Sequence, residues 1–463
     1  MIEKGKQLER LKLAKRLQAR AYEGALQGRR TENWRTANTS ANAELRPSLP
    51  LLRARCRDLV RNNGYAKQGV RIIKNSVVGY GIATYFKGAG KYAVARMQST
   101  FDTWANSTDC DADGLHTLQG LQALAMNTII ESGEVLIRTR WRKSSDGLTI
   151  PMQLQVLEPD FLDVTKDGFI DTGRIVQGVQ FDLIGRRVGY WLYKDHPGDT
   201  NVRSLQSTLV PAEEVAHVYL AERPGQVRGV PWLAPCIIRM RDFDEYEDTQ
   251  LIRQKIAACF SVFYYDREGE PANTDVSERV EPGIIEHLPP GSDVQIANPP
   301  EVQGFEEYSR VTLRGVASAL GVPYEALTGD YTNSKYSSAR MARIAFFSNL
   351  DDWQYNMLIP RMCHRVTAWF LRAATLAGIT PPKDISASYT VPSRQMTDPS
   401  KDVPATRDAI RSGLMTQSEA IRERGYSPEA FYAEMRADNE AMDAANIVLD
   451  SDARQDKAKR AGA

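Results

Sequence analysis

The sequence predicts an α+β protein, in which long helices alternate with short β-rich segments. Three observations lead to this class. Apolar residues recur at helical spacing along 233–243, hydrophobic alternation marks strands in the middle of the chain, and a β-rich segment at 259–301 separates two long helical patterns. Several structural units are expected, because a chain of 463 residues exceeds what one compact core usually holds.

Composition narrows the functional classes. The net charge is +1, and charged residues make up 25% of the chain. A protein that grips nucleic acid tightly through phosphate contacts needs a clear basic excess, so this balance argues against such a role. No apolar run approaches the roughly 18 residues of a membrane span, so no membrane contact is expected. The five cysteines are scattered without a CxxC pair, which favours buried, reduced thiols: Cys56, Cys110, Cys236, Cys259 and Cys363.

The first half of the chain is predicted to begin with an arm and to continue with helices and strands. Residues 1–50 are rich in lysine and arginine and end in a polar stretch, TANTSANAELRPS, that is typical of a flexible linker. Helical patterns follow at 51–77, 92–106 and 115–132. Alternating residues then predict four strands: EVLIRTRW (134–141), MQLQVLEP (152–159), IVQGVQFD (175–182) and GYWLYK (189–194).

A turn rich in proline and glycine at 223–231 precedes a long helix. Pro231 is expected at the helix start, where its missing N–H costs nothing. One face of the helix is apolar and consists of Leu233, Cys236, Ile237, Met240 and Phe243. Five acids then crowd together: Asp242, Asp244, Glu245, Glu247 and Asp248. They either line a wet, negative surface, form a solvated face, or pair with Arg239, Arg241 or Arg253 of a neighbouring subunit.

Short strands are predicted beyond this helix at 261–266, 281–288 and 293–297, and a second helix is predicted at 302–320. The order helix, β-module, helix is typical of a projection with a tip. The polar stretch GDYTNSKYSS at 329–338 is either a plain connection or a functional loop, because it is long and carries two tyrosines and Lys335.

The rest of the chain is predicted to be helical. Ser337 or Ser338 is expected to cap the next helix, and Pro360 should kink it before it continues to Gly378. Three further helical stretches each open with a capping-type residue: DVPATRDAIRSG (402–413), TQSEAIRERG (416–425) and SPEAFYAEMRADNEAM (427–442).

The sequence offers no convincing catalytic motif. Residues 109–114 have the D-x-D-x-D-G opening of a calcium loop, but Gly120 stands where the closing glutamate should be, so an Asp-rich turn is the better interpretation. GAGK at 88–91 lacks the flanking residues of a phosphate loop. The histidines are isolated: His116, His196, His217, His287 and His364. We therefore expect no catalytic residue, no bound metal and no cofactor.

Collinear segments of the chain resemble the portal proteins of lambda-like tailed phages. They lie in the same order as in that family and cover most of the chain up to about Gly425. The matching segments are Arg53–Ile82, Leu154–Asp163, RPGQVRGVPWLAP (223–235), RxRDxDEYEDxxLxRxKIAA (239–258), EPGIIEHLPPGSDVQIANP (281–299) and LGVPYEALTGDYTNSKYSSARMA (320–342).

The resemblance implies a portal fold with a helical and β-rich wing, long stem helices, a small β-containing clip and a helical crown. The implied divisions are 1–50 basic arm, 51–232 first half of the wing, 233–258 stem helix, 259–301 clip, 302–327 second stem helix, 328–338 tunnel loop, 339–404 second half of the wing with a long kinked helix, and 405–463 crown and tail.

The resemblance also implies a function that is not enzymatic. Twelve subunits would form a ring-shaped channel at one capsid vertex, through which double-stranded DNA enters and leaves without sequence specificity. The implied partners are the terminase large subunit, the head–tail adaptor, and the major capsid and scaffold proteins. The protein would be part of the virion and would assemble in the host cytoplasm.

Three groups of residues are candidates for these roles. The tunnel loop that faces DNA would contain Asp330, Tyr331, Asn333, Ser334, Lys335 and Tyr336. Clip docking would use Tyr264, Tyr265, Asp266, Arg267 and Glu268. The five stem acids would face either the channel or a neighbouring subunit. In the channel they would repel phosphate, which lets DNA slide instead of sticking.

Two other classes remain open at this point. One is a capsid adaptor or scaffold protein that forms oligomers without a channel. The other is a metal-dependent enzyme that acts on DNA, although no cluster of acids has the spacing that such a site needs.

Overall fold

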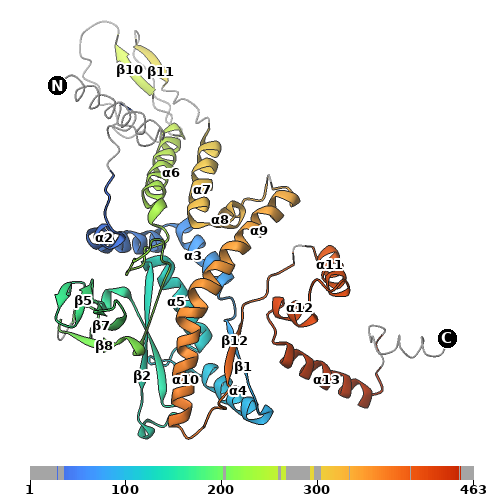
Figure 1. Cartoon of the computed structure of the whole chain (residues 1–463). Helices are drawn as coiled ribbons and strands as arrows, with labels where there is room; N and C mark the ends of the chain where they lie inside the picture. The colour runs from blue at the N-terminus through green and yellow to red at the C-terminus, as the bar shows by residue number, and fades with distance from the viewer. Residues whose placement is uncertain are drawn as a thin grey trace, which may run out of the picture.

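The computed structural model of the chain contains both helices and antiparallel sheets (Figure 1). It describes residues 29, 36–201, 205–258, 262–266, 292–296, 304–332, 334–396, 398–447 and 449. Within these ranges the side chains of 144, 256–258, 262–266 and 292–296 are not described. The α+β class predicted from the sequence is confirmed.

Two helices begin the described part of the chain, α2 (Ala41–Asn62) and α3 (Gly64–Val77). The predicted linker up to residue 50 is wrong, because α2 starts at Ala41. Ser40 caps this start by accepting a hydrogen bond from the Ala43 amide (3.3 Å). The pattern predicted as one helix at 51–77 is divided at Asn63, whose extended backbone ends α2 and whose side chain caps α3.

The next two helices contribute residues to the main hydrophobic core. Their bounds are α4 (Lys91–Ala105) and α5 (Leu118–Ser132), close to the prediction. Thr117 caps α5, and Gly133 ends it in a left-handed conformation. α5 packs against α2, α3 and strand β2 (Glu134–Trp141), and Met126, Ile129 and Ile130 are fully buried there.

Two antiparallel sheets follow. The first has the order β3-β2-β9, with β3 (Met152–Leu157) and β9 (Val215–Tyr219) on either side of β2. The second has five strands in sequence order: β4 (Gly168–Ile170), β5 (Gly173–Val176), β6 (Val179–Asp182), β7 (Arg187–Tyr193) and β8 (Ser207–Pro211).

One strand prediction in this region is wrong. The segment 175–182 is a hairpin and not a single strand, because Gln177 (φ 48°) and Gly178 (φ 85°) both adopt a left-handed conformation. Two consecutive residues with positive φ form the tight turn that matches the twist of antiparallel strands. The strands predicted at 134–141, 152–159 and 189–194 are confirmed as β2, β3 and β7.

The long helix α6 (Ile237–Ala258) and its counterpart α7 (Phe305–Leu320) project from this body (Figure 1). The prediction that Pro231 starts α6 is wrong. A turn and the 3-10 helix Ala234–Cys236 lie between Pro231 and α6. The predicted apolar face is confirmed, since Leu233, Cys236, Ile237, Met240 and Phe243 are all buried.

Strands β10 (Val262–Asp266) and β11 (Ser292–Ile296) pair antiparallel and lie beyond the ends of α6 and α7 in Figure 1. They correspond to two of the three strands predicted for this segment. The third, at 281–288, lies outside the described residues.

A long helical rod follows the short helix α8 (Tyr324–Thr328). It consists of α9 (Tyr336–Asp351), the π-helix Asp352–Cys363 and α10 (His364–Leu376). The N-cap residue of α9 is Lys335, so neither Ser337 nor Ser338 has the capping role predicted for it. Pro360, where the sequence predicts a kink, lies within the π-helix, whose hydrogen bonds differ from those of an α-helix.

The chain then returns to the body before the last helices. Strand β12 (Ser386–Thr390) pairs with β1 (Ala83–Lys87). The three predicted C-terminal helices are confirmed as α11 (Pro399–Arg411), α12 (Gln417–Glu423) and α13 (Pro428–Ala444). Thr416 and Ser427 cap α12 and α13 as predicted, whereas Asp398 and not Asp402 caps α11.

Four aromatic residues hold the sheet formed by β1 and β12 to α4 and α10. Phe101 and Phe370 meet edge to face at 4.9 Å, and Phe86 and Trp104 complete the cluster. Across the described ranges, no helix combines the length and the apolar character needed to traverse a lipid bilayer.

Candidate functional site

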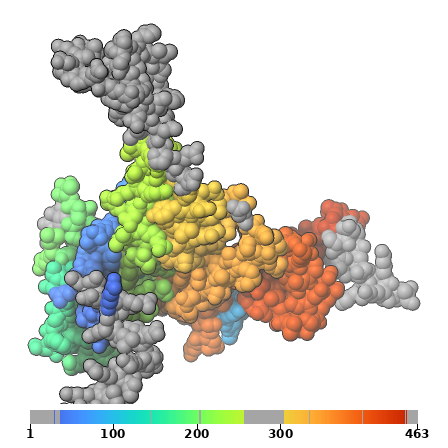
Figure 2. Space-filling model, turned by 90° about the horizontal axis from the view of Figure 1, so that it is seen from above, coloured from blue at the N-terminus to red at the C-terminus, as the bar shows by residue number. Residues whose placement is uncertain are grey.

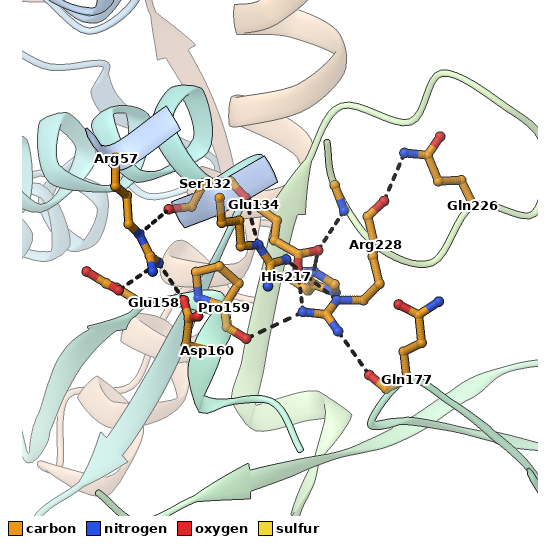
Figure 3. A network of polar contacts seen from close by, with 12 residues as sticks. Arg57, Ser132, Glu134, Glu158, Pro159, Asp160, Gln177, His217, Gln226 and Arg228 are labelled. Carbon is orange, nitrogen blue, oxygen red and sulfur yellow. Dashed lines mark hydrogen bonds and ion pairs between the residues drawn. The ribbon is translucent and has the colours of Figure 1, made fainter. Parts of the chain in front are cut away.

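A buried ionic cluster lies at the base of the projecting helices α6 and α7, where α2, β2, β9 and the loop before α6 meet (Figure 3). Glu134 is its centre and is fully buried. One carboxylate oxygen, Oε1, accepts from Arg53 and from Arg228 Nε (2.7 Å). The other, Oε2, accepts from the Gly229 amide (2.7 Å) and from His217 Nε2 (2.9 Å).

The hydrogen bonds of His217 define its tautomer. Its Nδ1 lies 3.3 Å from Arg187 Nη1, and a guanidinium can only donate, so Nδ1 accepts. The ring proton is therefore on Nε2 and points at Glu134. Burial lowers the pKa of His217 to about 4, so the imidazole is neutral at neutral pH.

Two buried guanidinium groups surround a single carboxylate in this cluster. Burial alone would raise the pKa of Glu134, but the charges of Arg228 and Arg53 and the His217 bond hold it well below its usual range. Arg228 also donates to the carbonyl groups of Gln177 (3.1 Å) and Pro159 (3.4 Å). Because both oxygens of Glu134 are occupied, the cluster cannot act as a general base, and its chemistry is that of a structural joint.

The entry of the chain into α2 is tied to the same loop. Asn42 donates to the Gly225 carbonyl (2.9 Å) and accepts from the Val227 amide (2.9 Å), and its own carbonyl accepts from Gln177 (2.9 Å). Arg223 adds a salt bridge to Glu44 (3.0 Å). The N-terminal segment is thus fixed to the base of α6.

The sequence did not predict this buried ionic cluster. His217 was classed as isolated, and neither Glu134 nor Arg228 stood out as a functional candidate. A signal was available, because Glu134 comes directly before three apolar residues, Val135 to Ile137, and Arg228 lies in a proline- and glycine-rich turn. Buried charges in such places need partners.

A second polar cluster lies beside the first, where Arg57 meets Glu158 and Asp160 (Figure 3), and His196 approaches Glu158 (3.6 Å). Within the described residues, ligand atoms of Glu158, Asp160 and His196 come within 4.8 Å of one another, close enough for a metal ion. Two contacts argue against one. Arg57 bridges both carboxylates, and His196 Nδ1 accepts from the Gly198 amide (3.1 Å). A neutral His196 thus carries its proton on Nε2, which cannot then bind metal.

The Asp-rich turn at 109–114 is confirmed as a turn. Asp111 accepts from the amides of Asp113 (3.1 Å), Leu115 (3.1 Å) and His116 (3.0 Å). Burial would raise the pKa of Asp111, but these amides lower it. Its oxygens therefore serve the backbone instead of a calcium ion.

The five acids of α6 have different surroundings. Asp244 accepts from Asn63 Nδ2 (2.6 Å), and Glu245 pairs with Arg241 of the same helix (3.0 Å). Partial burial and the charge of Asp248 raise the pKa of Asp244, and burial with the charges of Asp244 and Asp248 raises that of Glu247. Asp242 and Asp248 are exposed. Their orientation toward a channel or a neighbour stays a prediction.

Two of the arginines considered as partners for these acids have contacts within their own chain. Arg241 pairs with Glu245, as above. The guanidinium of Arg239 lies across Gly315 of α7, where a Cβ atom would be 1.7 Å from Nη1. Gly315 therefore leaves room for Arg239 between the stem helices.

The connection between α8 and α9 is shorter than the loop predicted at 329–338, because Tyr336 and the two serines that follow it already belong to α9. Asp330 accepts from the Thr332 amide (3.1 Å) and from the Tyr324 hydroxyl (3.3 Å), and these hydrogen bonds lower its pKa. Tyr331 (64% exposed) and Tyr336 (50% exposed) are accessible, as is Lys335. Ser334 is half-buried, and Asn333 lies outside the described residues.

Of the predicted docking residues, Tyr264, Tyr265 and Asp266 belong to β10. Their backbone pairs with Val294, Asp293 and Ser292 of β11. Arg267 and Glu268 lie outside the described residues.

Residues 27–354 match the family model described as phage portal protein, lambda family. This span covers well over half of the chain. The chain belongs to this family. The resemblance seen in the sequence is therefore confirmed, and the stem helices, the ionic joint and the loop 329–338 all lie within the matched span.

Curated relatives that are named as portal proteins align with this chain over most of their length. A probable portal protein of Halomonas phage phiHAP-1 is 25% identical over 458 residues, which covers 90% of this chain and 86% of the relative. Portal protein B of Escherichia phage lambda is 23% identical over 379 residues, covering 71% and 69%. The portal protein of Escherichia phage N15 is 22% identical, covering 88% and 87%.

Solved structures of neck and portal proteins align with this portal protein. One is the neck of a native gene transfer agent particle computed with C12 symmetry (TM-score 0.48, 16% identity, 81% of this chain and 94% of that chain). Another is the crystal structure of an HK97-family phage portal protein from Corynebacterium diphtheriae (TM-score 0.38, 11% identity, 75% and 96%).

Proposed function

We propose that this portal protein forms a ring-shaped channel at one vertex of a phage capsid. Double-stranded DNA would pass through it during packaging and ejection, and the ring would connect head and tail. Membership of the portal family supports the role, and the role requires no chemistry of the protein itself. The ionic joint fits it as well, because it fixes the stem instead of offering a reactive group.

The projection formed by α6 and α7 is the observation that carries this proposal. Tyr246 of α6 packs on Phe305 (5.8 Å) and Tyr308 (4.6 Å) of α7, so the two helices are held together far from the ionic joint. The paired strands β10 and β11 lie beyond them (Figure 1). A rigid helix pair with a small tip suits a stem that presents a docking module.

Exposed apolar side chains on the stem support assembly into a ring. On α6, Ile238 (71%), Leu251 (50%) and Ile252 (56%) are exposed, and on α7, Val311 (67%) and Tyr308 (45%). Isolated exposed apolar residues are ordinary, but several on one narrow helix pair are typical of a surface covered by neighbours. Contacts between unlike faces of successive subunits close into a ring.

Inside such a ring the loop 329–338 and the stem acids would meet the DNA. Lys335 and the exposed tyrosines provide a few contacts to the backbone. The acids Asp242 and Asp248 repel phosphate, so the wall would not hold DNA through many salt-sensitive contacts. Few attractive contacts together with repulsion by the acids would let the DNA slide through the channel.

The tip formed by β10 and β11 would bind the terminase large subunit during packaging and the head–tail adaptor afterwards. The body around the five-stranded sheet would contact the major capsid and scaffold proteins. The ring would assemble in the host cytoplasm and remain in the virion. In this account the motor that hydrolyses ATP is a separate protein.

Deletion of residues 261–300 tests the division into ring and docking tip. Rings of the shortened protein should form, as judged by electron microscopy, but should no longer bind the terminase large subunit in a pull-down. Unfolding of the whole protein would contradict a separate tip. A capsid adaptor without a channel would instead give oligomers that lack a central opening.

A further inference from the structure

Among the described residues, helix α13 covers its apolar stripe only in part, because Phe431 and Met442 are half-buried and Met435 is exposed. Phe431, Met435 and Met442 lie on one side of the helix at spacings of four and seven residues. Phe431 contacts Tyr426 (6.0 Å), but Met435 is 50% exposed. Pro428, at the first turn, is the one buried residue of this helix. A helix of this length gains most of its stability from packing of its apolar side and little from helix propensity, so an exposed apolar side indicates a missing partner.

The helix is also strongly acidic. It carries one basic residue, Arg436, against five acids: Glu429, Glu434, Asp438, Glu440 and Asp443. By helical geometry Asp438 and Glu434 border one side of the stripe and Asp443 borders the other. A surface that covers α13 should therefore have an apolar floor and basic walls.

Such a surface exists between α9, the segment after β12, and α12. Two adjoining hollows of about 660 and 770 Å³ share Arg343, Phe347, Arg394 and Arg424 in their walls. The floor includes Ile344 (54% exposed) beside Phe347. The hollows are large enough for the side chains of a partner helix, though not for the helix itself.

The walls of this groove carry a small excess of positive charge, because five arginines (Arg340, Arg343, Arg394, Arg422 and Arg424) line it against four acids (Asp351, Asp402, Glu419 and Glu423). Arg343 and Arg394 stand on Phe347, at 5.4 and 4.9 Å from its ring. Arg394 pairs with Asp351 and Arg340 with Asp402 (3.4 Å). Arg343 donates only to the Gln395 carbonyl (2.6 Å), and Arg424 to the Met396 sulfur (3.2 Å). A carbonyl and a thioether carry no charge, and among the described residues neither guanidinium forms an ion pair.

We propose that α13 of one subunit docks in this groove of the neighbouring subunit in the ring. The inference rests on the ring proposed above. α11–α13 lie together at one side of the molecule (Figures 1 and 2), where the first turn of α13 approaches Tyr85 and Lys87 of β1, so the rest of α13 can reach a neighbour without rearranging the body. The stripe covers Phe347 and Ile344, and the acids of α13 meet Arg343, Arg422 and Arg424.

DNA is the other anionic partner that such arginines can bind. The helix fits the observations better for two reasons. A phosphate backbone makes no use of the apolar floor, and DNA would leave the stripe of α13 uncovered. A neighbouring α13 satisfies both surfaces at once.

Cross-linking between differently labelled subunits tests the proposal. One protein carries Met435→Cys and the other Ile344→Cys, and the two are assembled together and treated with a short bismaleimide. Both also carry Cys259→Ser, because the other native thiols are buried: Cys56, Cys110, Cys236 and Cys363. We expect a covalent dimer on a denaturing gel. Ala437→Cys, on the opposite side of α13, replaces Met435→Cys in the control and should give about tenfold less dimer.

Charge reversal provides an independent test. Arg422→Glu with Arg424→Glu, or Glu434→Lys with Asp438→Lys, should each lower the fraction of closed rings about tenfold at a fixed concentration. Combining all four changes should restore it. Arg411→Glu, on an exposed position outside the groove, and Glu440→Lys, on the far side of α13, should leave it unchanged.

The outcomes separate this inference from the ring itself. If the unmodified protein forms no rings, the proposed function fails. If rings form but the cross-link does not, or if Ala437→Cys gives as much dimer as Met435→Cys, the docking of α13 is wrong. Loss of DNA binding with normal rings after reversal of Arg422 and Arg424 would assign the groove to DNA and overturn the proposal.

Discussion

Gly229 and Gly133 lie against each other at the base of the stem with no space for a side chain between them. A Cβ atom on Gly229 would be 2.1 Å from the carbonyl oxygen of Gly133. This approach brings the Gly229 amide to Glu134, with a nitrogen–oxygen distance of 2.7 Å. The loop that leads into α6 is thus positioned by backbone contact and by a buried carboxylate together.

Replacing Gly229 with alanine should destabilise the protein by about 3 kcal/mol, because backbone atoms on the other side cannot move away as a flexible side chain can. Urea unfolding followed by tryptophan fluorescence measures the change. Gly64→Ala is the matched control, since nothing lies within 4 Å of its Cβ position. An equal effect of the two substitutions would contradict the close contact.

Glu134→Gln should cost about 3–5 kcal/mol, because it leaves the guanidinium groups of Arg53 and Arg228 buried without a counterion. The substitution keeps the shape of the side chain, so packing is not the cause. Glu158→Gln removes a half-exposed partner of Arg57 and should cost less than about 1 kcal/mol. Thermal unfolding of the two variants compares them directly. Similar losses would mean that the cluster at Glu134 is not a strong joint.

Lowering the pH from 7 to 5 should destabilise the protein through His217. Its pKa is about 4 in the folded protein because of burial, and ordinary, near 6.5, when the chain is unfolded. The unfolded chain therefore binds more protons between these values, so stability is complete above pH 7 and falls as the pH drops below 6.5. The loss at pH 5 should be about 2 kcal/mol.

His217→Gln is the control for this pH dependence. Glutamine retains a donor for Glu134 but does not titrate, so the variant should be less stable at pH 7 and should lose less on acidification. The measurement is the urea midpoint at several pH values between 5 and 8. Parallel pH profiles of the variant and the original protein would exclude His217 as the source.

Asn63 lies between α2 and α3, and its side chain both caps α3 and connects it to α6. Its Oδ1 accepts from the Ala66 amide (2.8 Å), and its Nδ2 donates to Asp244 (2.6 Å). Asn63→Ala should lose both and cost about 2 kcal/mol. Asn63→Asp keeps the helix cap but places a second carboxylate against Asp244.

The aspartate variant should be less stable than the original at pH 7 and should recover toward pH 4, as one of the two carboxyl groups takes up a proton. Unfolding midpoints at both pH values test this. A deficit that does not change with pH would show that Asp244 is not in contact with residue 63.

Much of the fold could be predicted from local patterns. The spacing of Leu233, Met240 and Phe243 identified the buried side of the stem, since one helical face is a property of sequence alone. Thr416 and Ser427 marked helix starts because their capping bonds are local. The resemblance to the family predicted the order of the structural units along the chain. Hydrophobic periodicity carries no information about that order.

The errors have local physical causes. Glutamine rarely adopts a positive φ, so the turn at Gln177 could not be predicted and the hairpin at 175–182 was predicted as one strand. Pro231 suits a helix start, but the chain makes a turn and a 3-10 helix before α6 begins. The polar composition of 36–48 suggested a linker, although Ser40 caps a helix there.

The ionic joint could not be predicted for a different reason. Arg53, Glu134, His217 and Arg228 are far apart in the sequence, and only the tertiary structure brings them together. A single sequence gives no spacing rule for such a cluster. The same holds for the groove at Phe347, which three separate segments form.

The central claim is that this chain assembles into a ring with an open channel. Electron-microscope class averages of the purified full-length protein without DNA test it most directly. We predict closed rings of about twelve subunits with a central opening, as expected for repeated contacts between unlike faces. Protein that remains monomeric at high concentration, or that forms closed particles without a central opening, would contradict the account.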